Sequence, residues 1–251
     1  MFNPDPSFHR SRGVALATLS LSLAAISGCS PTSPQSTSPS NPPAAATAGS
    51  NTVARSEPPS SNTVAAATAA LERSDFAAAA ALLRDHIRLH PGDEEALFNL
   101  GFSLSRLRQT NDAIAAYQQC LTVLPTYAEA HNNLGNLLLG RREFDSAAAH
   151  FRSAVTNRPE SASAHNNLGK CLAQQSNLVE AIPLFREAVR LDPRQAEARY
   201  NLAVAYLNTG QLPEAEVELT LLLEQNPGMT PAQAAMARVQ RLLGKSVGPR
   251  R

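Results

Sequence analysis

Apolar and small residues recur at fixed spacings along most of the chain. In residues 128–159 the pair Leu134-Gly135 is followed by a small residue, an aromatic, a second small residue and a proline. The same series returns in residues 162–193, where Leu168-Gly169 takes the place of Leu134-Gly135. Self-similarity at a constant period of this length predicts a solenoid, because a single unit cannot bury its apolar face without neighbours.

This spacing resembles the tetratricopeptide repeat, in which each unit is a pair of antiparallel helices. That family places Leu-Gly early in the first helix, and small residues, an aromatic and a proline in and after the second. The same step along the sequence gives four clear repeats, which begin at Glu94, Ala128, Ala162 and Ala196. The resemblance implies an all-α fold, a right-handed superhelical solenoid of antiparallel helix pairs.

The ends of the repeat array depart from the pattern. We expect repeats over residues 62–229, the first of them degenerate because Ala66 and Ala67 replace Leu-Gly. Residues 230–244 predict a capping helix that ends at Gly244, and terminal units of a solenoid need such a polar cap for solubility. Residues 245–251 are expected to form a frayed tail.

Residues 1–28 have the pattern of an export signal. Arg10 and Arg12 precede an uncharged run that ends in small residues before Cys29. The run is shorter than the roughly 20 apolar residues that a transmembrane helix needs. Residues 26–29, Ile-Ser-Gly-Cys, are similar to the bacterial lipobox. That resemblance implies cleavage before Cys29 and attachment of acyl chains to it, palmitate among them, which together suffice for stable membrane anchoring. An ordinary secretory signal with an incidental cysteine is the alternative.

Residues 29–61 are rich in Ser and Pro and contain few large apolar side chains. Such a segment cannot bury enough surface to offset the entropy of ordering, so a disordered tether is predicted. An O-glycosylated stalk is the alternative. Ser30 follows the cysteine, which favours the outer membrane among bacterial lipoproteins. The predicted location is therefore the bacterial cell envelope, with the repeats lipid-anchored and facing the periplasm.

Asparagines gather on one side of the predicted first helices. At 100° per residue, positions 4, 7, 8 and 11 of each repeat share one side and positions 2, 5, 6, 9, 12 and 13 the other. The second side carries eight candidate peptide-binding residues: Asn99, Asn133, Asn167 and Asn201 at position 6, and Asn132, Asn166, Asn136 and Lys170 at positions 5 and 9. A carboxamide both donates and accepts hydrogen bonds. The stack is similar to the asparagine ladder of some superhelical members of the family, which implies binding of a peptide backbone. The alternative is that these asparagines help to fix helix packing.

Charge and motifs argue against several other functions. The net charge is +1 and the arginines are scattered, so a clustered basic face for nucleic acid is not indicated. The sequence shows no phosphate-binding glycine loop and no nucleophile or paired-carboxylate arrangement. We therefore predict no enzymatic activity and no cofactor.

Histidines and cysteines are assigned structural roles. His86 and His90 lie four apart, and His131 and His165 occupy equivalent positions, but a zinc site needs further ligands. No metal site is predicted. Apart from Cys29, the two cysteines Cys120 and Cys171 lie on different helices and are expected to be buried and unbridged.

The sequence thus predicts a membrane-anchored scaffold that binds a peptide or partner protein in a concave groove. Resemblance to bacterial repeat lipoproteins implies a role in secretion, pilus or envelope assembly. The alternative is an accessory subunit or recruiter of a cell-wall or sugar-modifying enzyme, without catalysis of its own. A third possibility is a cytosolic adaptor, which is distinguished by whether the mature chain begins at Cys29. Monomer and dimer are both admissible.

Overall fold

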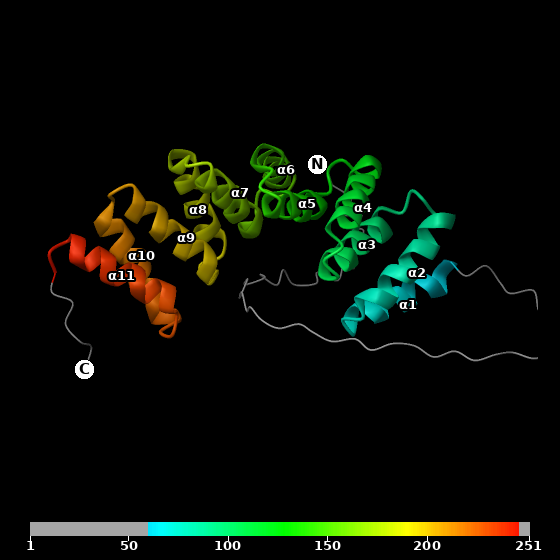
Figure 1. Cartoon of the computed structure of the whole chain (residues 1–251), viewed down its shortest axis with the longest axis horizontal. Helices are drawn as coiled ribbons and strands as arrows, with labels where there is room; N and C mark the ends of the chain where they lie inside the picture. Colours follow the sequence, from blue (N-terminus) through cyan, green and yellow to red (C-terminus); the bar gives the residue numbers. More distant parts are fainter. Residues whose placement is uncertain (1–59, 246–251) are drawn as a thin grey trace, which may run out of the picture. The chain divides into compact units, whose positions relative to one another are not determined.

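The computed structural model describes residues 60–245, with side chains from residue 63. These residues form helices and turns and contain no strand (Figure 1). The helices are α1 (Ser60–Glu72), α2 (Phe76–Leu89), α3 (Glu94–Arg106), α4 (Thr110–Val123), α5 (Ala128–Gly140), α6 (Phe144–Asn157), α7 (Ala162–Gln174), α8 (Leu178–Leu191), α9 (Ala196–Asn208), α10 (Leu212–Gln225) and α11 (Thr230–Leu242). The predicted signal peptide, Cys29, most of the tether and the tail from residue 246 lie outside the described residues.

The helices keep the period of the sequence. The odd-numbered helices, which are the first helices of each repeat, begin at one constant step along the chain, counted from Ser60. Each second helix packs against the first helix of its own repeat and against the first helix of the next repeat. From α3 onward, successive first helices also contact each other, so they form one continuous layer. The predicted all-α solenoid of antiparallel helix pairs is confirmed.

One turn type reverses the chain after every first helix. The turn residue has a positive φ in each repeat, at Ser74, Arg108, Arg142, Ser176, Gly210 and Gly244. The N–H of the next residue bonds back to a carbonyl near the end of the helix, as in Glu143 N to Leu138 O at 3.0 Å. This is the Schellman arrangement, which satisfies the last carbonyls of a helix. A residue other than glycine is strained in the left-handed conformation by its Cβ, so four of these turns lower the stability of the folded protein slightly.

Glycines in the first helices make room for rings of the second helices. A Cβ on Gly135 would lie 2.7 Å from the ring of Phe151, closer than real contacts allow. Gly101 and Gly169 stand in the same relation to Tyr117 and Phe185, with 2.8 Å in each case. The repeats at either end have alanine and leucine at these positions, all of them buried: Ala67 with Leu83, and Ala203 with Leu219. The degenerate first repeat thus replaces a glycine and a ring by a larger and a smaller residue.

The two remaining cysteines are buried free thiols, as predicted. Cys120 Sγ donates to Glu94 O and Cys171 Sγ to Phe144 O, both at 3.3 Å. Burial first, and the charge of Glu94 second, raise the pKa of Cys120 to about 12. A thiol that stays protonated is a poor nucleophile. In the part of the chain that the structure describes, no helix is long and apolar enough to cross a membrane.

Candidate functional site

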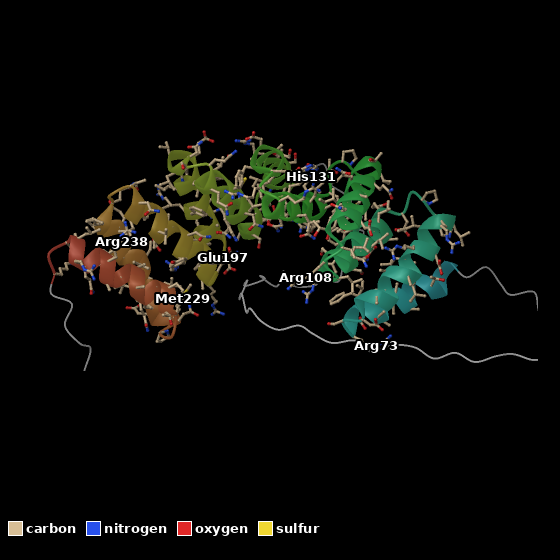
Figure 2. All side chains as sticks on the ribbon, viewed as in Figure 1. Arg73, Arg108, His131, Glu197, Met229 and Arg238 are labelled. Carbon is tan, nitrogen blue, oxygen red and sulfur yellow. The ribbon has the colours of Figure 1, made fainter. Side chains whose placement is uncertain are left out.

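The eight candidate residues lie on α3, α5, α7 and α9, and we call the surface that they mark the first-helix surface. Figure 2 draws the side chains of these helices and labels His131 on α5 and Glu197 on α9. Asn136 is exposed, whereas Asn166 is only 1% exposed. The other six are half-buried. The candidate residues therefore differ in how far a ligand could reach them.

Two asparagine pairs bond across neighbouring repeats. Asn167 Nδ2 donates to Asn132 Oδ1 at 3.0 Å, and Asn201 Nδ2 donates to Asn166 Oδ1 at 2.9 Å. In both pairs the position-6 amide of one repeat meets the position-5 carbonyl of the preceding repeat. We call each pair a closed rung, because its donor and acceptor are used within the protein. Partly buried amide bonds of this kind hold adjacent repeats in register and contribute about 1 kcal/mol each.

Asn133 finds a different acceptor. The position-5 residue of the preceding repeat is Phe98, which has no side-chain acceptor. Asn133 Nδ2 instead donates to the hydroxyl of Tyr117 at 3.3 Å. Burial strongly raises the pKa of Tyr117, although the bond from Asn133 opposes this, so the hydroxyl stays neutral. The amide of Asn133 is therefore also engaged within the protein.

Asn99 and Asn136 differ from these asparagines. The position-5 residue before Asn99 is Val64, whose side chain cannot accept a hydrogen bond. Within residues 63–245, the side chains of Asn99 and Asn136 make no hydrogen bond. We call these two the open amides. They lie on α3 and α5, which contact each other, so both are at the N-terminal part of the repeat array.

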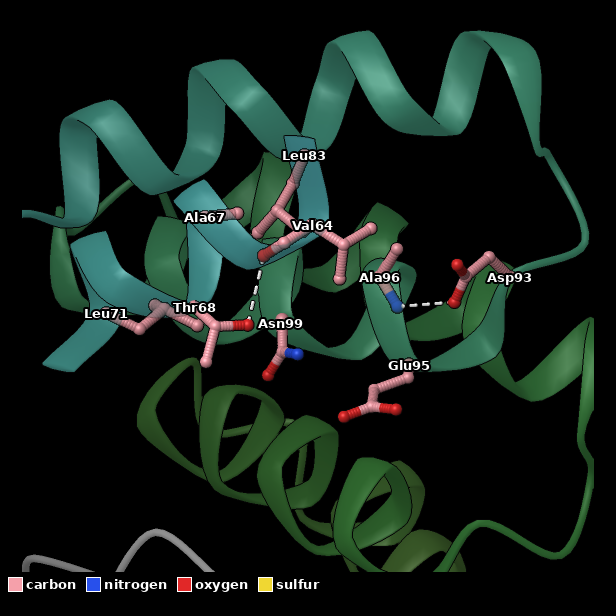
Figure 3. Close-up of a pocket in the computed structure, with 9 residues that line it drawn as sticks. All are labelled: Val64, Ala67, Thr68, Leu71, Leu83, Asp93, Glu95, Ala96 and Asn99. Atoms are coloured by element: carbon pink, nitrogen blue, oxygen red, sulfur yellow. Dashed lines mark hydrogen bonds between the residues drawn. The ribbon is translucent and has the colours of Figure 1, made fainter. Parts of the chain in front are cut away.

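A small pocket of about 40 Å³ adjoins Asn99 (Figure 3). Its apolar lining comes mainly from α1 and α2, and Glu95 and Asn99 of α3 supply polar groups. The lining residues are Val64, Ala67, Thr68, Leu71, Leu83, Asp93, Glu95, Ala96 and Asn99. Thr68 Oγ1 already donates to Val64 O at 3.0 Å, and Asp93 Oδ1 accepts from Ala96 N at 2.9 Å. This volume has room for one ordered water or a small side chain.

Ion pairs occupy charged groups on α5, α7 and α9. Lys170 Nζ lies 2.8 Å from Glu197 Oε1, which joins position 9 of one repeat to position 2 of the next. Glu129, at position 2 of its own repeat, pairs with Arg158. Both pairs are partly exposed, so each contributes little stability. Glu95, the position-2 residue beside the pocket, makes no ion pair with any described residue.

A second set of cross-repeat contacts lies at position 4. His131 Nε2 and His165 Nε2 each lie 2.9 Å from a proline carbonyl, of Pro125 and Pro159 respectively. Arg199 and Gln233 donate in the same way to the carbonyls of Pro193 and Pro227, at 3.1 and 2.7 Å. These bonds bear out the structural role expected for the two histidines. These contacts have a signal in the sequence, because each of these polar residues follows a proline by six positions.

The contact between His86 and Asp93 also holds two helices together. His86 Nε2 lies 2.7 Å from Asp93 Oδ2, which ties α2 to the N-cap of α3. Burial opposes the charge of Asp93, but the hydrogen bonds from Ala96 N and His86 outweigh it and lower the pKa of this carboxyl. Within residues 63–245 there is no group of three His, Cys, Asp or Glu residues that could hold a metal ion.

Comparison with known proteins gives the same architecture. Models of the family described as tetratricopeptide repeat match residues 64–121, 103–158 and 132–196, and a second model with this description matches residues 172–239. No match was found among the curated proteins.

Solved structures share the fold at low identity. MamA from Desulfovibrio magneticus is 21% identical, with 67% of this chain and 96% of that chain covered and a TM-score of 0.61. YrrB is 23% identical, with 66% and 85% covered and a TM-score of 0.60. The pilF protein of Pseudomonas aeruginosa is 18% identical, with 74% and 92% covered and a TM-score of 0.59.

Proposed function

Because this chain belongs to the tetratricopeptide repeat family, we propose that it is an interaction scaffold that binds an extended segment of a partner protein on its first-helix surface. The observation that carries the proposal is the pair of open amides on α3 and α5. A peptide backbone presents alternating N–H and C=O groups, and a carboxamide can pair with both. YrrB is described as a TPR protein with an unusual peptide-binding site, which supports the same type of function here.

The N-terminal part of the surface suits a ligand better than the closed rungs do. Asn167 and Asn201 each give one N–H to the neighbouring repeat, so a ligand that takes this N–H has to replace an existing bond and gains little free energy. A ligand at Asn99 or Asn136 replaces water alone. The pocket beside Asn99 could also take a small side chain of the same segment, and Glu95 lies at its polar edge. Binding is therefore proposed over α1, α3 and α5.

A photo-crosslinker placed in one repeat tests this surface. Gly140, at position 13 on α5, is exposed, and a Cβ added there would meet no atom of another part of the chain within 4 Å. Ala149 is an exposed residue on α6 of the same repeat. We expect p-benzoylphenylalanine at Gly140 to capture a discrete partner in living cells, and the same probe at Ala149 to capture none. Equal capture from both positions would contradict binding on the first-helix surface.

We further propose that the scaffold is held at the bacterial envelope by lipid on Cys29, with residues 30–59, which precede α1, as a tether. Support comes from the lipobox-like residues 26–29 after an export-type run. A scaffold placed in this way would serve secretion, pilus or envelope assembly, with the outer membrane as the favoured site. Mass spectrometry of the mature protein is expected to find an acylated N-terminal Cys29, and Cys29→Ala is expected to release the protein from membranes. An unmodified chain that begins at Met1 would refute the lipid anchor, and it would leave the proposed binding on the first-helix surface unaffected.

A further inference from the structure

Two histidines of one repeat meet through the same ring nitrogen. His131 on α5 and His150 on α6 place their Nδ1 atoms 2.9 Å apart. The ring centres are 5.2 Å apart, so both nitrogens lie near the line between the rings. This is the geometry of an N–H···N hydrogen bond. Two rings that shared a metal ion would instead aim their lone pairs at a third point beside that line.

The other nitrogen of His131 fixes its protonation. His131 Nε2 lies 2.9 Å from the carbonyl oxygen of Pro125, which can only accept. Nε2 therefore carries a proton, and in the neutral ring Nδ1 is an acceptor for the Nδ1–H of His150. One added proton is tolerated, because His131 can then donate from Nδ1 to a neutral His150. A second added proton puts two N–H groups head to head and removes the bond.

Other repeats fill the same two positions with groups that do not share a proton. The equivalents of His131 and His150 are His165 with Leu184 in the next repeat, and Arg199 with Glu218 in the one after. Arg199 Nη1 lies 2.6 Å from Glu218 Oε2, and in this pair Arg199 is buried and Glu218 is partly buried. Among these repeats, residues 128–161 thus hold a contact that can change its charge near neutral pH.

The charged groups around this contact lie on the helices and turns packed against it. Elements packed on α5 and α6 are α3, α4 and α7. The titratable groups of these three helices are Glu94, Glu95 and Arg106 on α3, Asp112, Tyr117 and Cys120 on α4, and His165, Lys170 and Cys171 on α7. Besides the two histidines, α5, α6 and their flanking turns carry Tyr127, Glu129, Arg141, Arg142, Glu143, Asp145, Arg152, Arg158 and Glu160, of which Glu129 pairs with Arg158. Burial first, and the charge of His131 second, lower the pKa of His150.

We propose that the His131–His150 contact is an acid-sensitive joint, which holds α5 and α6 together at neutral pH and loosens when both rings are protonated. His150 has a lower pKa when folded than when unfolded, so the folded state binds fewer protons as the pH falls. The stability that this contact contributes is therefore complete above the unfolded pKa of about 6.5 and decreases as the pH falls below it.

Two matched variants separate the joint from ordinary acid effects. His150→Leu installs the residue that the next repeat has at this position, Leu184. His131→Gln removes the partner ring and keeps a donor for Pro125 O, as Gln233 does for Pro227 O. His165→Gln is the control, because His165 has no histidine opposite it. All three are made in the full chain and checked for helix content.

The test is a titration of the histidine Cε1–H signals by NMR, together with amide exchange at neutral and at mildly acidic pH. We expect His150 to titrate below the ordinary value of about 6.5, and to return toward that value in His131→Gln. Exchange protection over α5 and α6 is expected to fall about tenfold more than over α9 and α10 at the lower pH, and this excess is expected to vanish in His150→Leu but persist in His165→Gln. An ordinary titration of His150 in the native chain, or an unchanged excess in His150→Leu, would overturn the joint.

Discussion

The asparagine at position 6 is bonded differently at the two ends of the first-helix surface. Toward the C-terminal end, Asn167 and Asn201 donate across repeats to Asn132 and Asn166. At the N-terminal end, Asn99 faces a repeat with Val64 at the acceptor position and its side chain makes no hydrogen bond within residues 63–245. Identical residues at position 6 can therefore join repeats or remain open to a ligand, and the neighbouring repeat decides which.

The core beneath this surface shows a related contrast between middle and end repeats. In the middle, Gly135 lies under the ring of Phe151, and toward the C-terminal end Ala203 is paired with Leu219. Each combination fills the space between two helices, because a larger residue on one side is matched by a smaller one on the other. Exchange of one member alone breaks the match.

Gly135→Ala should have the largest effect among the changes considered. The new Cβ would lie 2.7 Å from the ring of Phe151, and the packed ring has little room to move. We expect a loss of about 2 kcal/mol in the free energy of unfolding, as for other overpacked cores. Chemical denaturation followed by circular dichroism measures it. The double variant Gly135→Ala with Phe151→Leu copies the pair Ala203 and Leu219 and is expected to recover part of the loss. No recovery would mean that the paired volumes do not explain the pattern.

Asn166→Ala should break a closed rung at a cost of about 1 kcal/mol, because the partly buried amide of Asn201 loses its acceptor. Asn99→Ala is the matched change at the open end and is expected to alter stability by less than about 0.5 kcal/mol. Thermal and urea unfolding of the two variants compare them directly. Equal destabilisation would show that Asn99 has a partner in the folded protein.

Val64→Asn should convert the open end into a closed one. An asparagine there reproduces the acceptor that Asn132 offers to Asn167. We expect a gain of up to about 1 kcal/mol and a clear drop in partner capture from Gly140. Val64→Thr serves as the control, because threonine is polar and similar in size to valine but too short to take the place of the asparagine carbonyl. A gain in stability with undiminished capture would show that the bonding state of Asn99 does not affect partner binding.

Arg142→Gly should give a small gain. Arg142 has a φ of +63° in the same turn where Gly210 and Gly244 occur. Relief of the Cβ strain is expected to stabilise the protein by about 0.5 to 1 kcal/mol, partly offset by the greater freedom of glycine in the unfolded chain. The reverse change Gly210→Arg should cost a similar amount. A melting temperature that moves the same way in both variants would contradict this explanation.

The sequence predicted the fold because its markers have local physical causes. The ring of Phe151 leaves no room for a Cβ at position 135, and both residues belong to one helix pair. This requirement therefore recurs with the period of the repeat, and the period could be recognised in the sequence. The open and closed amides were not predicted, since each bond joins residues in different repeats. Position 6 looked uniform, and the informative residue was Val64 at position 5 of the degenerate repeat. The contact between His131 and His150 was missed for a similar reason, because it joins two helices at unmarked positions.

Partner capture in two asparagine variants tests the central claim most directly. With the photo-crosslinker at Gly140, capture is compared in Asn99→Ala and Asn201→Ala backgrounds at equal protein levels and at a temperature where both are folded. The open-amide account predicts that Asn99→Ala loses most of the crosslinked partner while Asn201→Ala retains it, although Asn201→Ala removes a hydrogen bond between repeats. Loss in Asn201→Ala with full capture in Asn99→Ala would contradict the account.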